Sequence, residues 1–200
     1  SVLQEERLTS EDERNLLRWL YVANARGHFS GSSETTLDVG GVTLRFKKAL
    51  IATGTGPARL PIPGLAEAGY LTNETVFNLT ARPRRLAVIG GGPIGSELAQ
   101  AFCRLGSEVT VLEMSDHILV REDPDAAAIV QTALTRDGVR VVVECGIERV
   151  ERQGAEKVIH FTCDGVQSVT VDEILVGAGR APNTEGLGLD AAGVNHDRKG

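Results

Sequence analysis

Residues 85–97 read Arg-Leu-Ala-Val-Ile-Gly-Gly-Gly-Pro-Ile-Gly-Ser-Glu, and residues 107–113 read Ser-Glu-Val-Thr-Val-Leu-Glu. A short apolar run leads into a glycine turn, after which apolar residues recur at helical spacing from Ile94 to Leu105. Gly106 stands where a helix stop belongs, and residues 109–112 form another apolar run. This order predicts a strand, a glycine turn, a helix and a second strand, which is the unit that holds a dinucleotide in Rossmann-like folds.

Each glycine of the turn has its own physical reason. Gly90 ends the strand where the chain must turn sharply, Gly92 lets the backbone approach a pyrophosphate, and Gly95 lets the helix lie against the strand. The helix N-terminus then directs N–H groups and the positive end of its dipole at the phosphates. The cofactor-binding residues predicted for this turn are Gly90, Gly91, Gly92, Pro93, Ile94, Gly95, Ser96 and Glu97.

Glu113 closes the second strand, 23 residues after Gly90. An acidic residue at this distance accepts hydrogen bonds from the adenosine ribose. Its carboxylate would repel a 2′-phosphate, and residues 114–117 supply no fixed positive charge. The sequence therefore favours NAD(H) over NADP(H), and the alternative is a solvated Glu at a strand end.

The composition of the chain indicates which classes of partner and which cellular location to expect. A formal charge of -6, with no basic stripe, argues against nucleic acid. No apolar run approaches the roughly 18 residues of a membrane helix, and the N-terminus has no signal-peptide layout, so we expect a soluble, cytoplasmic protein. The three cysteines lie far apart in sequence and the histidines lack ligand spacing, which predicts structural thiols and no metal site.

The residues before the glycine turn predict two elements of secondary structure. A capping box at residues 10–13 precedes an amphipathic helix over about residues 11–22. Alternating apolar residues over 36–39 and 42–46 flank Gly40 and Gly41, which predicts a hairpin.

The next segments predict a boundary between two domains. Residues 50–52 are expected to form a short buried strand, and the proline-rich residues 57–64 an extended connector. We place the border near residues 81–83, which separates residues 1–82 from the nucleotide-binding domain of residues 83–200.

Downstream patterns complete a parallel sheet and add a meander. Asp123 and Pro124 predict the cap and first position of a helix that ends at residues 137–138. Residues 139–143 then predict a third parallel strand. Three antiparallel strands with turns at residues 153–154 and 164–165 come next, at residues 147–150, 158–162 and 166–171, and residues 173–176 return to the parallel sheet.

With these residues in place, the chain resembles the FAD-dependent pyridine nucleotide-disulfide oxidoreductases. The sequence of residues 90–102, together with residues 121–125 downstream, is most similar to the mercuric reductase-like branch of this family. The lipoamide dehydrogenase-like proteins are the next most similar. The pieces that match, in the order found in that family, are residues 48–54 with 57–64, then 90–97, 111–113 and 179–184.

The resemblance implies an α/β fold in which a Rossmann-like NAD-binding domain, with a parallel sheet and an antiparallel meander, is inserted into a split FAD domain. Residues 1–82 would be the partial FAD domain and residues 83–200 the NAD domain. The family's redox disulfide, its catalytic His and its dimerisation domain would lie outside this chain. We therefore expect no catalytic residue here, an inactive isolated chain and a homodimeric parent protein.

The resemblance also implies further cofactor contacts. Glu97, expected in the first turn of the helix, would lie near the nicotinamide, although its charge also suits the helix dipole. Pro93 stands where many relatives carry an aromatic residue. Gly179 would let the backbone approach the nicotinamide side and Ile147 would line the adenine pocket, with a turn glycine and a core residue as their alternatives. The residues that would touch FAD, or simply end a strand, are Thr53, Gly54 and Thr55.

Three functions fit this sequence. The leading hypothesis is that the parent passes hydride from NADH to FAD and on to a disulfide, in the manner of mercuric reductases. The first alternative is an NADH-dependent flavoprotein without a redox disulfide, such as an NADH oxidase or a ferredoxin reductase. The second is a non-catalytic nucleotide-binding module.

Overall fold

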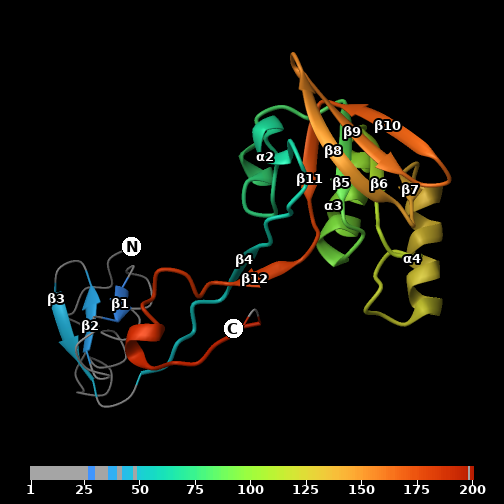
Figure 1. The fold of residues 1–200 in the computed structure, drawn as a ribbon. Coiled ribbons are helices and arrows are strands. Elements are labelled where there is room, and N and C mark those ends of the chain that lie inside the picture. Colours follow the sequence, from blue (N-terminus) through green and yellow to red (C-terminus); the bar gives the residue numbers. More distant parts are fainter. Residues whose placement is uncertain (1–26, 30–35, 40–41, 47–48, 198) are drawn as a thin grey trace, which may run out of the picture. The chain divides into compact units, whose positions relative to one another are not determined.

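The computed structural model describes residues 27–29, 36–39, 42–46, 49–197 and 199–200, and Figure 1 shows its elements. The chain divides into two compact units, residues 57–180 and residues 1–56 with 181–200. The border predicted near residues 81–83 separates an FAD domain from an NAD domain, which is a different division from that into compact units. It stays a prediction. The predicted helix over residues 11–22, with its capping box, lies outside the described residues.

A four-stranded parallel sheet forms the centre of the unit of residues 57–180. Its strands are β5 (Arg85–Ile89), β6 (Glu108–Leu112), β7 (Arg140–Val142) and β11 (Glu173–Val176), in the order β11-β5-β6-β7. Parallel pairing of each neighbouring pair confirms the predicted sheet. The strands of its centre are apolar on both faces because both faces are covered.

Two helices connect the first three strands. Helix α3 (Pro93–Arg104) joins β5 to β6, and helix α4 (Pro124–Arg136) joins β6 to β7. Asp123 caps α4 as predicted, since its side chain accepts a hydrogen bond from the Asp125 N–H at 2.9 Å. Gly106, just after α3, has a φ of 94°, which only glycine adopts freely.

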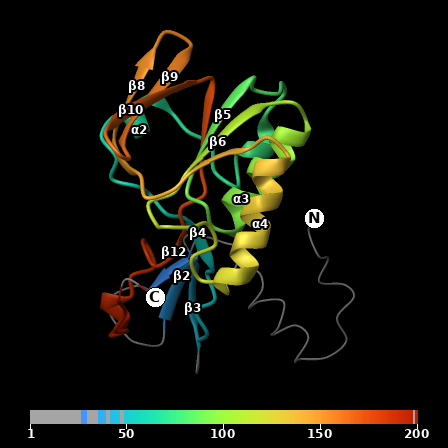
Figure 2. The same ribbon diagram turned by 90° about the vertical axis from the view of Figure 1, so that its right-hand side faces the viewer.

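Alternate residues of β5 point into two separate cores. Leu86 and Val88 are buried in a cluster with residues of α3 and α4, whereas Ala87 and Ile89 are buried in a cluster with residues of the meander. Figure 2 shows α3 and α4 on one face of the sheet and the meander on the other. The alternation follows from the period of two along a strand, and it divides the interior of this unit into two layers.

The meander forms as its alternating residues predict. Strands β8 (Gly146–Gln153), β9 (Glu156–Thr162) and β10 (Val166–Val171) pair antiparallel in the order β10-β9-β8. Phe161 and Ile159 are completely buried on the sheet side. Helix α2 (Leu65–Ala68), which packs on β8, and the short η2 (Val76–Asn78) complete this unit.

The other unit contains the predicted hairpin. Strands β1 (Gly27–Phe29), β2 (Thr36–Val39) and β3 (Val42–Arg45) form an antiparallel sheet in that order. The predicted buried strand over residues 50–52 is wrong, because these residues form no strand and the side chains of Leu50 and Ile51 are exposed. A strand needs a neighbour to receive its backbone hydrogen bonds, and the described residues offer none to this segment.

Two short strands and a turn of helix complete the described elements. Strand β4 (Thr55–Pro57) pairs with β12 (Arg180–Pro182), and η3 (Asp190–Ala192) lies near the end of the chain. The proline-rich segment after β4 runs without regular structure as far as α2, as predicted. Among the described residues, no helix has the length and the apolar composition needed to cross a bilayer.

Candidate nucleotide site

The glycine turn lies at the carboxyl end of β5, where the strand order reverses. Strand β5 pairs with β6, the next strand along the chain, on one side and with β11 on the other. In open α/β sheets, ligands bind at the carboxyl ends of strands at such a switch point. The fold therefore places residues 90–96 where a nucleotide site is expected.

Three glycines interlock at this point. A Cβ atom on Gly95 would lie 2.0 Å from the carbonyl oxygen of Gly90, and one on Gly177 would lie 3.0 Å from the Gly95 Cα. Gly90 itself has a φ of 99°, and a Cβ there would lie 2.8 Å from the Cα of Ala178. These neighbours are backbone atoms that cannot move aside, so helix α3 reaches the strand only because all three positions lack a side chain.

Gly92 differs from these glycines because it faces open space. A Cβ there would meet only the Gly177 carbonyl oxygen, at an ordinary contact distance of 3.8 Å. Its φ of -68° is also available to any residue. The structure therefore does not need glycine at this position, whereas a ligand that approaches the backbone would.

Helix α3 presents its amino end at the same place. Gly92 is the cap and Pro93 the first helical residue, and no side chain caps the helix. Among the described residues, the N–H groups of Gly92, Ile94 and Gly95 have no acceptor in the protein. These donors, together with the positive end of the helix dipole, suit a phosphate.

The Glu113 carboxylate lies directly beside the turn. Its Oε2 accepts a hydrogen bond from the Gly91 N–H at 2.6 Å, and its Oε1 accepts one from the Ser115 N–H at 2.9 Å. The Gly91 carbonyl oxygen accepts hydrogen bonds from the Leu119 N–H at 2.8 Å and from Ser96 Oγ at 3.1 Å. This network holds a half-buried negative charge at the end of β6, next to the amino end of α3.

Two further predicted residues lie in the same unit. Ile147 is half-buried and packs against the core cluster that contains Ile89 and Leu112. Gly179 is exposed with a φ of 99°, and its carbonyl oxygen accepts a hydrogen bond from the Ala58 N–H at 3.2 Å. Ile147 is the second residue of β8 and Gly179 follows β11, and their contact with a cofactor stays a prediction.

The residues predicted to touch FAD belong to the other unit, the one of residues 1–56 and 181–200. Thr53, Gly54 and Thr55 are exposed there. The Thr53 hydroxyl donates to the Asn183 carbonyl oxygen at 2.7 Å, and the Asn183 N–H donates to the Gly54 carbonyl oxygen at 2.9 Å. These bonds join the two segments of that unit. The alternative interpretation, that these residues end a strand, is wrong, because residues 50–52 form no strand and Thr55 begins β4. Their contact with FAD stays a prediction.

One prediction about α3 is wrong. Glu97 is the fifth residue of the helix and lies beyond its first turn, which contains no acidic residue. The error arises because the helix begins at Pro93, so the argument from the helix dipole is weak at this position. Glu97 is exposed, and with Pro93, Gln100 and Val130 it lines a groove of about 240 Å³ beside α3.

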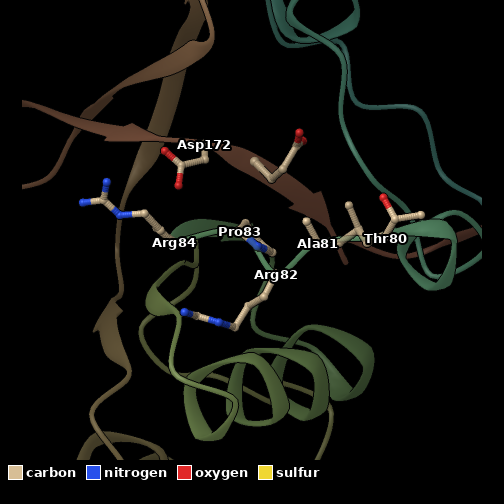
Figure 3. A pocket seen from close by; sticks show the side chains of 8 residues that line it. Thr80, Ala81, Arg82, Pro83, Arg84 and Asp172 are labelled. Carbon is tan, nitrogen blue, oxygen red and sulfur yellow. The ribbon is translucent and has the colours of Figure 1, made fainter.

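A second groove, of about 360 Å³, lies at the opposite edge of the sheet, where β5 and β11 begin (Figure 3). It is lined by residues 79–84 with Asp172 and Glu173. Arg85 donates to Asp172 at 2.5 Å and to Glu156 at 2.6 Å, and the hydrogen bond from Arg85 holds the pKa of the Asp172 carboxyl below its ordinary value. This ion-pair cluster joins strands far from the glycine turn.

No described residues form a group of three or more His, Cys, Asp or Glu side chains that could hold a metal ion. Sequence reasoning missed three contributors to the glycine turn, namely Gly177, Ser115 and Leu119. A signal for the first existed, since Gly177 and Gly179 flank a single alanine directly after an apolar strand. Nothing in the sequence marks the backbone N–H groups of the other two.

Comparison with known proteins identifies the relatives of this chain. A family model described as pyridine nucleotide-disulphide oxidoreductase matches residues 5–200. A mercuric reductase of Lysinibacillus sphaericus is 43% identical over 161 residues, which cover 80% of this chain and 30% of that protein. A dihydrolipoyl dehydrogenase of Thermus scotoductus is 36% identical over 197 residues, which cover 92% of this chain and 41% of that protein.

Solved structures show the same relationship. The HOCl-induced flavoprotein disulfide reductase RclA from Escherichia coli, in its Cu(II) complex, matches with a TM-score of 0.80 at 30% identity. The match covers 88% of this chain and 40% of that one. The chain thus spans less than half the length of the relatives it matches.

Proposed function

We propose, from the premise that this chain belongs to the pyridine nucleotide-disulphide oxidoreductase family, that its unit of residues 57–180 binds the electron donor NADH. The observation that carries this proposal is the arrangement around the glycine turn. Gly92 faces open space, the amino end of α3 offers unpaired N–H groups, and Glu113 stands beside them. These groups suit a pyrophosphate and an adenosine ribose respectively.

The residues of the turn have distinct roles in binding. The N–H groups of Gly92, Ile94 and Gly95 would hold the pyrophosphate, and Glu113 would accept hydrogen bonds from the ribose hydroxyls. Ile147 would pack against the adenine, and Gly179 would let the backbone approach the nicotinamide. Bound NADH supplies a hydride, and the chain positions it through these contacts.

The preference for NADH over NADPH rests on Glu113. The two backbone N–H groups that bond its carboxylate hold the negative charge in place at the end of β6. A 2′-phosphate at the ribose would face this charge without an Arg or Lys among residues 114–117. Repulsion of like charges would therefore weaken NADPH binding.

For the whole parent protein, we propose transfer of hydride from NADH to FAD and on to a disulfide, with a mercuric reductase-like substrate. Mercuric reductases and a disulfide reductase among the relatives support this proposal. The cytoplasmic location stays a proposal from the composition of the sequence, and the homodimeric state of the parent rests on the family resemblance. Thr53, Gly54 and Thr55 would touch the FAD.

Calorimetric titration of the chain with NADH and with NADPH tests the nucleotide site. We expect NADH to bind at least about tenfold more tightly, which corresponds to about 1.4 kcal/mol. Glu113→Gln removes the charge but keeps an oxygen acceptor, so it should lose most of this discrimination. Equal affinity of the unchanged chain for both nucleotides, or no binding of either, would overturn the role of Glu113.

A further inference from the structure

Cys145 and Cys163, which lie 18 residues apart in the sequence, come together at one end of the meander. In the pairing of β8 with β9, Gly146 stands opposite Thr162 and Ile147 opposite Phe161. The paired strands end at Gly146 and Thr162, and the same register continued by one residue sets Cys145 opposite Cys163. Residues opposite one another in antiparallel strands have Cα atoms about 4.5–5.5 Å apart, which lies within the range of about 4.4–6.8 Å found across disulfides.

The two side chains also point to the same face. Cys145 precedes Ile147 by two residues and Cys163 follows Phe161 by two, so the alternation along each strand puts all four on one side. The packing agrees with this, because Cys145 and Phe161 are members of one buried cluster and Ile147 and Cys163 pack against it. All three cysteines of the chain are free thiols in the structure.

Neighbouring carbonyl groups hold both sulfur atoms near the end of β7. The Cys145 thiol donates to the Val142 carbonyl oxygen and the Cys163 thiol to the Val143 carbonyl oxygen, each at 3.6 Å. Burial and the nearby Cys163 thiol raise the pKa of Cys145 to about 11. Cys145 is thus a buried thiol at neutral pH, whereas Cys163 is half-buried and is the sulfur that an oxidant reaches first.

We propose that Cys145 and Cys163 form a reversible cross-strand disulfide when the protein meets hydrogen peroxide. The Cys163 thiolate attacks one peroxide oxygen, the O–O bond breaks, and water leaves after protonation, which produces a sulfenic acid. The Cys145 sulfur then attacks the Cys163 sulfur, the S–O bond breaks, and a second water leaves. Two thiols lose two protons and two electrons in total, and the peroxide is reduced to two water molecules.

This site is separate from the nucleotide proposal but close to it in the fold. The Cys145 N–H donates to the Glu113 carbonyl oxygen at 3.0 Å, so the disulfide would form next to the residue that follows β6. A dithiol reductant would return two electrons and reopen the bond. The pair is therefore a modification site inside the meander, and its chemistry does not depend on which nucleotide the chain binds.

Peptide mapping of the whole 200-residue chain tests the proposal. Trypsin places each cysteine on a peptide of its own, because cleavage yields residues 86–104, 141–149 and 158–180. The chain is treated with hydrogen peroxide, the peroxide is removed with catalase, and remaining thiols are alkylated before digestion. We expect most molecules to yield peptide 141–149 joined to peptide 158–180, with alkylated Cys103 and loss of the link after dithiothreitol.

Variants and the state of association sharpen this test. Cys103→Ser should keep the link, whereas Cys145→Ser should abolish it and leave Cys163 as an over-oxidised acid. The oxidised chain should remain monomeric on a non-reducing gel, as required for a link within one chain. The proposal is wrong if Cys163 of the unchanged chain becomes over-oxidised while Cys145 can still be alkylated, or if the link involves Cys103. Both outcomes are measured on the unchanged chain, so they hold even where a variant fails to fold.

Discussion

Single glycines around the nucleotide turn have different reasons to be glycine. Gly95 is required by the fold, since a Cβ there would lie 2.0 Å from the Gly90 carbonyl oxygen. Gly92 is not, because its backbone angles suit any residue and the space in front of it is open. At this scale the structure separates a glycine that the fold requires from one that the fold does not require, which we propose faces the nucleotide.

This difference gives a paired prediction. Gly95→Ala forces α3 away from β5 and should lower the free energy of unfolding by about 1–3 kcal/mol or more, as overpacking does. The free energy of unfolding of Gly92→Ala should stay within about 0.5 kcal/mol of that of the unchanged chain. Its affinity for NADH should fall about tenfold or more, because the added methyl group occupies the space proposed for the pyrophosphate. Urea unfolding and calorimetry measure the two effects. Equal loss of stability in both variants would contradict this assignment.

At the scale of elements, helix ends and strand ends show where local sequence decides structure. Helix α4 begins where Asp123 and Pro124 predict, because the capping carboxylate and the fixed φ of proline act on neighbouring residues alone. The paired ends of β5 and β11 depend instead on Arg85 and Asp172, which lie 87 residues apart in the sequence. No local pattern identifies that ion pair.

Removal of the α4 cap should cost little but measurable stability. Asp123→Ala leaves the Asp125 N–H without its acceptor, so we expect a loss of about 1 kcal/mol in the free energy of unfolding. Asp123→Asn keeps a side-chain oxygen at the same place, so its free energy of unfolding should fall by no more than a few tenths of a kcal/mol. Chemical denaturation of both variants is the measurement, and an equal loss in the two would argue against the capping bond.

The ion pair between Arg85 and Asp172 predicts a dependence on pH. Arg85 lowers the pKa of Asp172 in the folded protein from 3.8. The pair therefore contributes stability that is complete above the unfolded pKa and is lost as the pH falls through the lower folded pKa. Asp172→Asn should cost about 1 kcal/mol at neutral pH, and its difference from the unchanged chain should shrink near pH ~3.

The control for this prediction is Asp164→Asn, an exposed position in a turn where Asn also accepts a positive φ. Its unfolding free energy should follow that of the unchanged chain across the whole pH range. A cost of Asp172→Asn that stays the same between pH ~7 and pH ~3 would show that the charge of Asp172 contributes nothing.

At the scale of the whole molecule, the two buried clusters that the described residues form belong to the unit of residues 57–180. Every residue of the cluster on the helix side and of the cluster on the meander side lies between Leu60 and Ala178. The predicted cofactor-binding residues other than Thr53, Gly54 and Thr55 lie in the same unit of residues 57–180. This unit thus has its own interior and its own candidate site.

We expect a shortened protein of residues 57–180 to fold cooperatively and to bind NADH with the affinity of the 200-residue chain, within about threefold, or about 0.7 kcal/mol. The reason is that a domain with a complete core folds on its own. Circular dichroism during urea unfolding and calorimetry with NADH provide the measurements. Loss of cooperative unfolding would show that residues 1–56 or 181–200 supply part of its stability.

Local sequence patterns were enough to predict the parallel sheet, the meander, the cap of α4 and the glycine turn, because apolar periodicity and turn residues act over a few neighbouring positions. Two predictions from local sequence were wrong. Residues 50–52 are an apolar run that has no partner strand and stays exposed, and Glu97 lies beyond the first turn because α3 begins at Pro93. Folding of the whole unit places Gly177 against Gly95, the Gly91 N–H beside Glu113, and the Cys145 and Cys163 thiols beside the neighbouring carbonyl groups of Val142 and Val143. Most of these contacts join residues far apart along the chain, and strand pairing and packing create them.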